Sequence, residues 1–406
     1  MKTRTAWLAA LGIGLSVMVS GCTANEPAAG TPAPPPPARA AATSNSPTSS
    51  PTSPAQPTQR VPAKPTRTSV TVVMNGDLLW HNTLWFGARE DARRRGHGGY
   101  DFAPLLAGMK PVIASADMAI CHEEVPLAPP GGPYRNYPLF AAPPHVVKAI
   151  VATGYDVCTT ASNHAIDQGF AGLRRTLDDL DRAKIPHVGT ARTKAESERP
   201  MIFTTKEGVK IAIVAATFSL NGLPMPEGKP WAVQRLSARS LLRQAHRART
   251  AGADIVLAAV HVGTEYSTSE NAQQVKLART LTASPDVDLV YMHHPHVVQP
   301  WTTMNKKWVL YGVGNTVAQQ EANRAYEGAT GRFTFTRTGN GRFTVSKAEY
   351  IPTLVTIYRP GRPARLYQVS AALKTAKGSF RSRLLEAQRR TTAVVMRKHP
   401  PGLTRG

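Results

Sequence analysis

The sequence predicts an α/β fold for most of its length, and three observations support this prediction. From residue 70 onward, short runs of β-branched residues alternate with longer stretches of helical periodicity, which is the pattern of strands joined by helices. Hydrophobic residues make up 42% of the 406 residues, enough to bury a sizeable core. Polar residues of the types that bind metals or transfer protons directly follow several of the predicted strands.

Residues 1–21 have the features of an export signal. A positively charged start precedes an apolar stretch, 8–19, that is shorter than the ~20 residues a membrane span needs. Small residues precede Cys22, an arrangement that resembles the lipobox of bacterial lipoproteins and implies acylation of that cysteine. The alternative is an ordinary secretory peptide with a bystander cysteine. We expect an extracytoplasmic protein that is anchored to the cell membrane by an N-terminal lipid.

Residues 22–69 contain this cysteine and a segment rich in Pro, Ala, Ser and Thr. Twelve of the 34 prolines lie between residues 23 and 69. Such a composition cannot bury a core, so we expect a disordered tether with a reach on the order of 140 Å at roughly 3 Å per residue. Because the working domain would then lie outside the cytoplasm, we expect no nucleic-acid partner, despite a formal net charge of +23.

The main domain is predicted to span residues 70–320. The expected strands cover residues 70–74, 117–121, 155–160, 254–260 and 287–292. The expected helices cover residues 144–153, 170–184, 238–250 and 270–283. This alternation favours parallel strands whose carboxyl ends meet at one edge.

Two segments follow the main domain. Residues 321–370 are predicted to be a β extension that completes it, because Asn340-Gly341 is a strong two-residue hairpin turn between two β-rich runs. Residues 371–406 form a basic C-terminal segment with an expected helix over 380–398. Between residues 359 and 406 there are twelve Lys or Arg residues and a single acid, Glu386. This segment is either a solvated, partly docked tail or a surface for an anionic polymer or membrane.

Each predicted strand of the main domain is followed by potential ligands. The residues, in chain order, are Asp77, Glu124, Asn163 with His164, His261, and His294 with His296. Their ligand atoms are oxygen and imidazole nitrogen, with no thiolate. That chemistry suits two divalent metal ions such as Mn²⁺, Fe or Zn²⁺ better than a structural zinc site.

Six ordered motifs resemble those of the CapA family of poly-γ-glutamate capsule biosynthesis proteins. In this sequence they read GD at 76–77, ADMAICHEEVP at 116–126, SNHAIDQG at 162–169, HVGTE at 261–265, HHPH at 293–296 and YGVGN at 311–315. The resemblance covers about 70–320. It implies the calcineurin-like metallophosphoesterase fold, a two-sheet β-sandwich flanked by helices, and it specifies the reaction much less closely than the fold.

The resemblance also implies roles for single residues. Asp77 would be the first metal ligand and Glu124 a bridging or second ligand, with Glu123 a weaker candidate. Asn163 and His261 would bind the second metal. The remaining implied ligands are the spaced pair His294 and His296, next to His293 at a position that varies in the family, while His164 would act as general acid or electrostatic stabiliser.

Further residues are expected around this centre. His122 stands where the family usually has Asn and would add a ligand or a substrate contact, and Asp167 would orient His164 or hold a loop. His122, Asp167, Glu265 and Asn315 are expected to support the metal ligands or to contact the substrate. Anion contacts are assigned, by proximity alone, to Arg89, Arg135 and Arg192. The sequence leaves open whether Cys121 and Cys158 form a disulfide or remain buried free thiols.

Two functions fit these expectations. The first is an exported, lipid-anchored, divalent-metal-dependent hydrolase of phosphoester-like bonds in the biosynthesis of a capsule or cell-envelope polymer of the poly-γ-glutamate type. The second is a non-catalytic, metal-stabilised accessory protein that binds or anchors an anionic envelope polymer or its membrane-bound synthase. The expected partners in both cases are an anionic envelope polymer, the membrane through the lipid, and a polymer synthase.

Overall fold

The computed structural model describes residues 69–406. The export signal, Cys22 and the proline-rich segment lie outside the described residues, so the expectations for them remain predictions. Among the helices of the described part, none has both the length and the apolar character needed to span a membrane.

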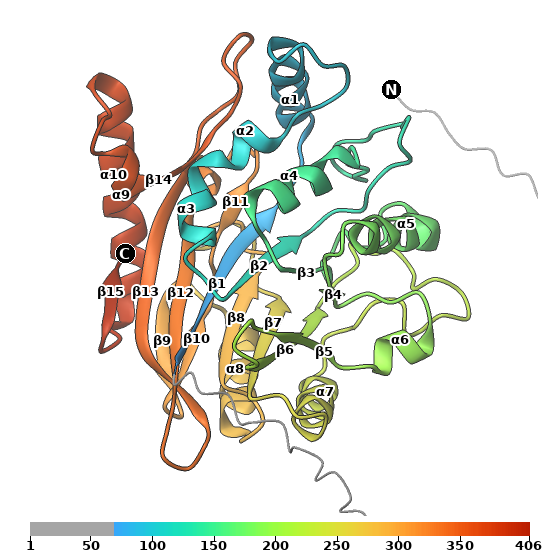
Figure 1. Cartoon of the computed structure of the whole chain (residues 1–406), viewed down its shortest axis with the longest axis vertical. Coiled ribbons are helices and arrows are strands. Elements are labelled where there is room, and N and C mark those ends of the chain that lie inside the picture. Colours follow the sequence, from blue (N-terminus) through green and yellow to red (C-terminus); the bar gives the residue numbers. More distant parts are fainter. Residues whose placement is uncertain (1–68) are drawn as a thin grey trace, which may run out of the picture. The chain divides into compact units, whose positions relative to one another are not determined.

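Two β-sheets face each other, with helices on their outer faces (Figure 1). The first sheet has the strand order β14 (Leu366–Gln368), β13 (Phe343–Val355), β12 (Glu327–Arg337), β1 (Ser69–Leu78), β2 (Met118–Glu123), β3 (Val157–Thr159) and β4 (His187–Val188). In addition, β11 (Asn315–Val317) pairs with β1, and β15 (Leu403–Arg405) pairs with β13. The second sheet has the order β5 (Met201–Thr204), β6 (Lys210–Thr217), β7 (Ile255–His261), β8 (Leu289–His293), β10 (Lys307–Leu310) and β9 (Trp301–Met304).

Helices and short turns connect these strands. The segments between β1 and β3 are α1 (Asn82–Arg94), α2 (Ala103–Leu106), η1 (Ala107–Met109), α3 (Lys110–Ile113) and α4 (His145–Thr153). Those between β3 and β8 are α5 (Gly169–Arg182), α6 (Lys194–Glu198), α7 (Ala238–Thr250) and α8 (Ala272–Ala283). The rest are η2 (Asn323–Tyr326), α9 (Val369–Ala372), α10 (Gly378–Val395) and η3 (Met396–Lys398).

The core follows from the alternation of side chains along each strand. In β1, Val72 and Met74 join the apolar cluster between the two sheets, whereas Val73 joins the cluster beneath the helices of the first sheet. In β7, Leu257 faces the same inter-sheet cluster and Val256 packs toward α7 and α8. Successive residues of a strand point to opposite faces, so each central strand is buried on both sides. The predicted α/β class with two sheets flanked by helices is confirmed.

The expected strands and helices are present, with ends shifted by a few residues. The largest shift is in β1, which was expected to end at Met74 and continues to Leu78. Its pairing with β2 is irregular between Met74 and Asp77, so the Asn75-Gly76 step interrupts the register without ending the strand. The antiparallel β12–β13 pair forms the expected hairpin, and both strands belong to the first sheet.

The basic C-terminal segment packs on the first sheet. Leu384, Ala387 and Val395 of α10 are buried. Arg383 and Arg390 both form ion pairs with the buried carboxylate of Glu327, and Arg390 Nε lies 3.1 Å from Glu327 Oε1. Part of the positive charge of this segment therefore neutralises a buried acid and is not available to a partner.

A disulfide joins Cys121 in β2 to Cys158 in β3. The two residues are directly paired in the parallel β2–β3 register, and their Cα atoms are 4.5 Å apart. The bond therefore connects two neighbouring strands, both of which lead into loops that carry candidate site residues.

We predict that removal of this bond lowers stability. Replacing both Cys121 and Cys158 by Ala should lower the free energy of unfolding by about 2–4 kcal/mol, because a crosslink across 37 residues restrains the unfolded chain. Urea unfolding would measure this, with Cys22→Ala alone as the control. In that control protein only these two cysteines remain, so two reactive thiols in the unreduced, unfolded state would contradict the assignment.

Candidate metal centre

The candidate site residues gather at one edge of the two sheets. Strands β1, β2 and β3 of the first sheet are parallel, as are β6, β7 and β8 of the second. Asp77 pairs in register with His122, and His261 pairs with His293. Polar residues at the ends of strands that are distant in sequence thus become neighbours, because parallel strands place their carboxyl ends together.

The backbone around Asp77 leaves no room for a larger residue before it. A Cβ atom on Gly76 would lie 1.9 Å from the carbonyl oxygen of Gly314, so only glycine allows the two segments to approach this closely. The Asp77 amide donates a hydrogen bond to that same carbonyl oxygen at 3.1 Å. This packing fixes Asp77, which is fully buried, between β2 and β11.

Asp77 contacts two histidines, one at the end of β8 and one in the turn that follows it. Asp77 Oδ1 lies 2.7 Å from His293 Nδ1, and Asp77 Oδ2 lies 3.1 Å from His296 Nδ1. His296 Nδ1 is also 2.9 Å from Asn315 Oδ1. His294 and His296 both have left-handed backbones, with φ of 93° and 58°, which non-glycine residues rarely adopt. Such strained turns occur where function requires them, here to direct adjacent imidazoles toward one centre.

Glu124 is the second buried carboxylate of the cluster. Its Oε1 atom lies 3.7 Å from His296 Nε2 and 3.9 Å from His261 Nε2. His261 Nε2 is 2.7 Å from Asn163 Oδ1, and Asn163 Nδ2 donates to Asn221 Oδ1 at 3.1 Å. This last hydrogen bond orients the Asn163 amide so that its oxygen, the atom that binds metals, faces the cluster.

His122 lies within the same cluster. Its Nδ1 atom is 2.7 Å from Thr159 Oγ1, and its Nε2 atom is 3.0 Å from His261 Nδ1. The His122 ring also stacks on His293, with ring centroids 4.1 Å apart. It therefore positions two candidate ligands, and its ring nitrogen also lies close to the side chains of Asp77 and His293.

His164 is held beside the cluster by an acid. Its Nδ1 atom lies 2.7 Å from Asp167 Oδ2, which also accepts a 2.8 Å hydrogen bond from the backbone amide of Phe140. The Phe140 ring packs edge-on against the His164 ring, with centroids 4.9 Å apart. Fixed in this way, His164 keeps its Nε2 atom free of the Asp167 contact, which is the arrangement that a proton donor or acceptor needs.

Glu265 marks the exposed side of the site. Its side chain is 44% exposed, and its Oε1 atom is 3.8 Å from His294 Nε2. His294 also contacts Phe218, with ring centroids 4.7 Å apart. The cluster thus has a buried interior and one acidic residue at the border with solvent.

Burial and the neighbouring charges shift the pKa values of the cluster in opposite directions. Burial would raise the pKa of Asp77, but hydrogen bonds from His293 and His296 hold it well below its usual range. Burial would lower the pKa of His296, but Glu124 and Asp77 raise it to about 10. Burial raises the pKa of Glu124 well above its usual range, although His296 opposes the shift. The carboxylates and this imidazole therefore depend on one another for charge compensation.

Three further histidines of the cluster, His122, His261 and His294, have lowered pKa values. Burial lowers the pKa of His294 to about 3 and holds the pKa values of His122 and His261 well below their usual range. Neighbouring histidines lower all three further. The neutral imidazole is the form that binds a metal ion.

The donor set fits a divalent cation. Both carboxylate oxygens of Glu124, His293 Nε2 and His294 Nδ1 are buried without a hydrogen-bond partner among residues 69–406. Polar atoms rarely stay unsatisfied inside a protein unless an ion or a water completes them. Three overlapping groups place their ligand atoms within 4.8 Å of one another; they are Asp77 with His122 and His293, Asp77 with Glu124 and His296, and Glu265 with His294 and His296.

The structure brings together nearly all the residues that the sequence singled out. One addition is His293, whose family position was described as variable and whose side chain contacts Asp77 directly. The local signal was weak, because three histidines in a four-residue run do not reveal which of them point inward. By contrast, the Glu123 carboxylate accepts hydrogen bonds from Trp80 Nε1 at 2.9 and 3.0 Å, on the other side of the strand, and burial raises its pKa to about 8.

Two of the three arginines that were assigned to anion contacts have partners within the fold. Arg192 forms ion pairs with Asp178, Asp181 and Glu196, so its charge is already neutralised. Arg89 donates to the Tyr100 hydroxyl on the surface.

Comparisons with known proteins match the part of the chain that carries the site. The family model described as bacterial capsule synthesis protein PGA_cap matches residues 71–320, more than half of the chain. The PGA biosynthesis protein CapA of Bacillus subtilis (strain 168) is 28% identical over 201 residues, which cover 49% of this chain and 52% of that protein. A probable polyglutamine synthesis accessory protein of Mycobacterium tuberculosis (strain H37Rv) is 26% identical over 194 residues, covering 45% of this chain and 50% of that protein.

The chain spans about half the length of these curated relatives. Among solved structures, the calcineurin-like phosphoesterase YfkN of Bacillus subtilis aligns with 80% of this chain and 98% of that chain, at 14% identity and a TM-score of 0.44. The family match includes the strand ends that supply Asp77, Glu124, Asn163, His261 and His296. The chain therefore belongs to the bacterial capsule synthesis protein family PGA_cap.

Proposed function

We propose that this protein is a divalent-metal-dependent hydrolase of phosphoester-like bonds that acts in the biosynthesis of an anionic capsule or envelope polymer. The observation that carries this proposal is the buried cluster around Asp77 and Glu124, with unsatisfied ligand atoms next to the His164–Asp167 pair. The polymer class rests on the family and on its relatives, one of which is described as a PGA biosynthesis protein.

Different residues of the chain would bind the metal ions and transfer the proton. Asp77, Glu124, Asn163, His261 and the histidines after β8 would hold two divalent ions of the type Mn, Fe or Zn. When bound, such ions supply Lewis acidity toward the oxygens of an ester. His164 would transfer or share a proton at its Nε2 atom. Asp167 accepts from Nδ1 and so holds the imidazole in the tautomer and orientation that this step needs.

The compartment forms part of the same proposal. Export and acylation of Cys22 would hold the domain outside the cytoplasm, at the membrane where an anionic surface polymer and its synthase would meet it. The extracytoplasmic location agrees with the Cys121–Cys158 disulfide, because such bonds persist in oxidising compartments.

Two adjacent glutamates should differ in their effect on metal binding. Glu124→Gln should weaken metal binding by roughly 100-fold or more, since even residues that only orient a ligand contribute about 10–100-fold. Glu123→Gln is the matched control, because that side chain faces Trp80. Metal content per chain after dialysis, measured by mass spectrometry, would report both. Equal metal content in the two variants would contradict the placement of the site.

Substitution of His164 should affect catalysis and leave metal binding unchanged. His164→Gln should lower kcat for a chromogenic phosphodiester by about 10²–10⁴-fold while metal content stays unchanged. Asp167→Asn keeps one oxygen near Phe140 and His164, so its loss should be smaller. If no ester tested is turned over by the metal-loaded wild-type protein, the non-catalytic accessory function replaces this proposal.

Acylation of Cys22 should determine whether the protein stays with the membrane. In cells, the wild-type protein should fractionate with membranes, whereas Cys22→Ala should lose the acylated cysteine and leave the membrane fraction. Immunoblots of membrane and soluble extracytoplasmic fractions would show this. A variant that remains in the membrane fraction in full would count against lipid anchoring.

A further inference from the structure

Helix α7 carries a row of arginines on its outer face. Arg239, Arg243 and Arg247 are spaced four residues apart, so they project from the same side of the helix, about 6 Å apart along its axis. All three are exposed, whereas Leu241 and Ala245 of the same helix are buried. The helix contains no acidic residue. No carboxylate of residues 69–406 lies within ion-pair distance of these three side chains.

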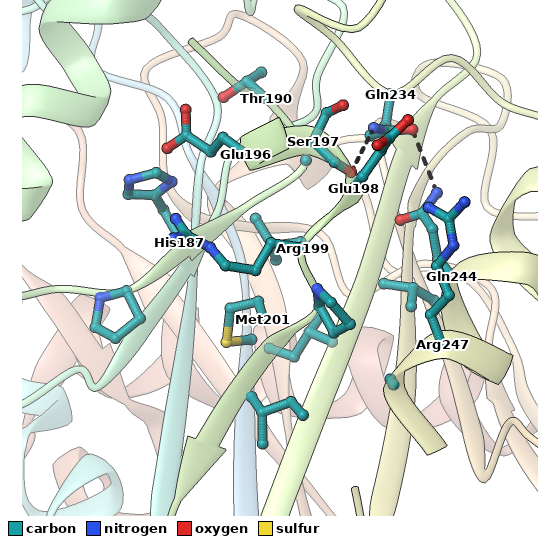
Figure 2. Close-up of a pocket in the computed structure, with 18 of the residues that line it drawn as sticks. His187, Thr190, Glu196, Ser197, Glu198, Arg199, Met201, Gln234, Gln244 and Arg247 are labelled. Carbon is teal, nitrogen blue, oxygen red and sulfur yellow. Dashed lines mark hydrogen bonds between the residues drawn. The ribbon is translucent and has the colours of Figure 1, made fainter. Parts of the chain in front are cut away.

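Arg247, at the C-terminal end of the row, lines a cavity of about 300 Å³ between β4, α6, β5 and α7 (Figure 2). Its lining includes Arg247 from α7, Arg199 from the segment after α6, and the amide side chains Gln234 and Gln244. Two adjoining hollows, of about 190 and 660 Å³, share Arg243 and Arg247, and the larger one also reaches Arg239. The surface is therefore hollowed along the whole arginine row.

The charges in this region leave a net positive surface. The carboxylates of Asp181 and Glu196 line the cavity, but Arg192 engages both of them. Arg199 has no carboxylate partner in the described part of the chain, and Glu198 is the remaining cavity carboxylate without a basic partner there. Four arginines without acidic partners, counting Arg199, thus face a single free acid, which favours an anionic ligand.

The cavity also offers acceptors for an N–H group. Gln244 Nε2 donates to Gln234 Oε1 at 3.3 Å and Gln234 Nε2 to the Ser197 carbonyl oxygen at 3.4 Å. The side-chain amide nitrogens are therefore used within the protein, and the side-chain oxygen of Gln244, Oε1, has no donor among the described residues. His187 also lines the cavity, with a buried Nδ1 atom that has no hydrogen-bond partner there. A ligand that combines carboxylates with N–H groups would satisfy both kinds of atom.

The row starts at the same edge of the sheet as the metal centre. The backbone amide of Leu236, just before α7, donates to the carbonyl oxygen of Thr217, which pairs in register with His261. Phe218, the next residue, contacts His294. A chain that lies along α7 would therefore extend away from the candidate metal centre and toward the cavity.

We propose that α7 and the adjoining cavity bind a linear polycarboxylate whose repeating units are joined by amides. Carboxylates lie against Arg239, Arg243 and Arg247, and one unit enters the cavity, where Arg199 takes its carboxylate and Gln244 accepts from its N–H group. The polymer class rests on the proposed function. An anionic lipid surface is the competing occupant, and it would contact the exposed row without filling the cavity.

The test is binding of fluorescent poly-γ-glutamate to the full chain, measured by polarisation at physiological salt. The triple variant R239Q/R243Q/R247Q should raise Kd roughly ten-fold or more, because each exposed arginine–carboxylate pair contributes modestly and the three act together. The matched control, R359Q/R362Q/R389Q, removes three exposed arginines elsewhere and should leave Kd near the wild-type value. Unchanged melting curves and metal content would show that both triple variants are folded.

A second variant distinguishes the polymer from a membrane. R199Q should weaken polymer binding several-fold and leave binding to phosphatidylglycerol vesicles unchanged. The proposal is overturned if the wild-type protein does not bind the polymer, or if the two triple variants lower the affinity for the polymer equally. It is also overturned if R199Q binds the polymer like wild type while the α7 triple variant loses vesicle binding. Turnover of a small phosphodiester by the α7 triple variant should equal that of wild type, so a failure of the proposed hydrolysis is seen separately.

Discussion

The arrangement of the site depends on the contact between the carboxylate of Asp77 and the imidazoles of His293 and His296. Asp77 lies on a central strand of one sheet and the histidines lie at the end of a central strand of the other. A fully buried carboxylate is costly unless positive charge compensates it. This contact supplies the compensation and at the same time aligns the carboxyl edges of the two sheets.

The other unusual features near the site make this contact possible. Gly76 lets β1 approach the segment at Gly314, and the left-handed backbones of His294 and His296 let a tight turn present several imidazoles. Conformational strain of this kind is supported by the rigid core on either side of each sheet. Even so, the cluster retains buried ligand atoms without partners, so the contacts of the chain alone do not satisfy it. These unsatisfied ligand atoms are the physical reason for assigning a cation to the cluster.

The strands and the residues at their ends could be predicted from the sequence, because hydrophobic alternation sets the strands and parallel pairing sets the edge at which they meet. Distances between side chains could not. The contact of His293 with Asp77 joins the ends of two strands in different sheets, β8 and β1, and the Cys121–Cys158 bond depends on the β2–β3 register. Neither is encoded in a local pattern. The ion pairs of Arg192 could not be predicted either, because its acidic partners lie on α5 and α6 and the spacing of the motifs does not indicate them.

The number of basic residues in a segment does not show how many of them are free to bind an anionic ligand. The C-terminal segment has the largest local excess of basic residues, yet Arg383 and Arg390 are bound to the buried Glu327, and Lys398 is paired with Glu270. Helix α7 contributes fewer arginines, but three of them stand in a row without acidic partners in the described chain. A charge that is already compensated within the fold contributes little to an external field, whereas uncompensated charges on one helix face add. The surface for an anionic ligand is therefore set by which arginines the fold leaves unpaired, and not by where most of them lie in the sequence.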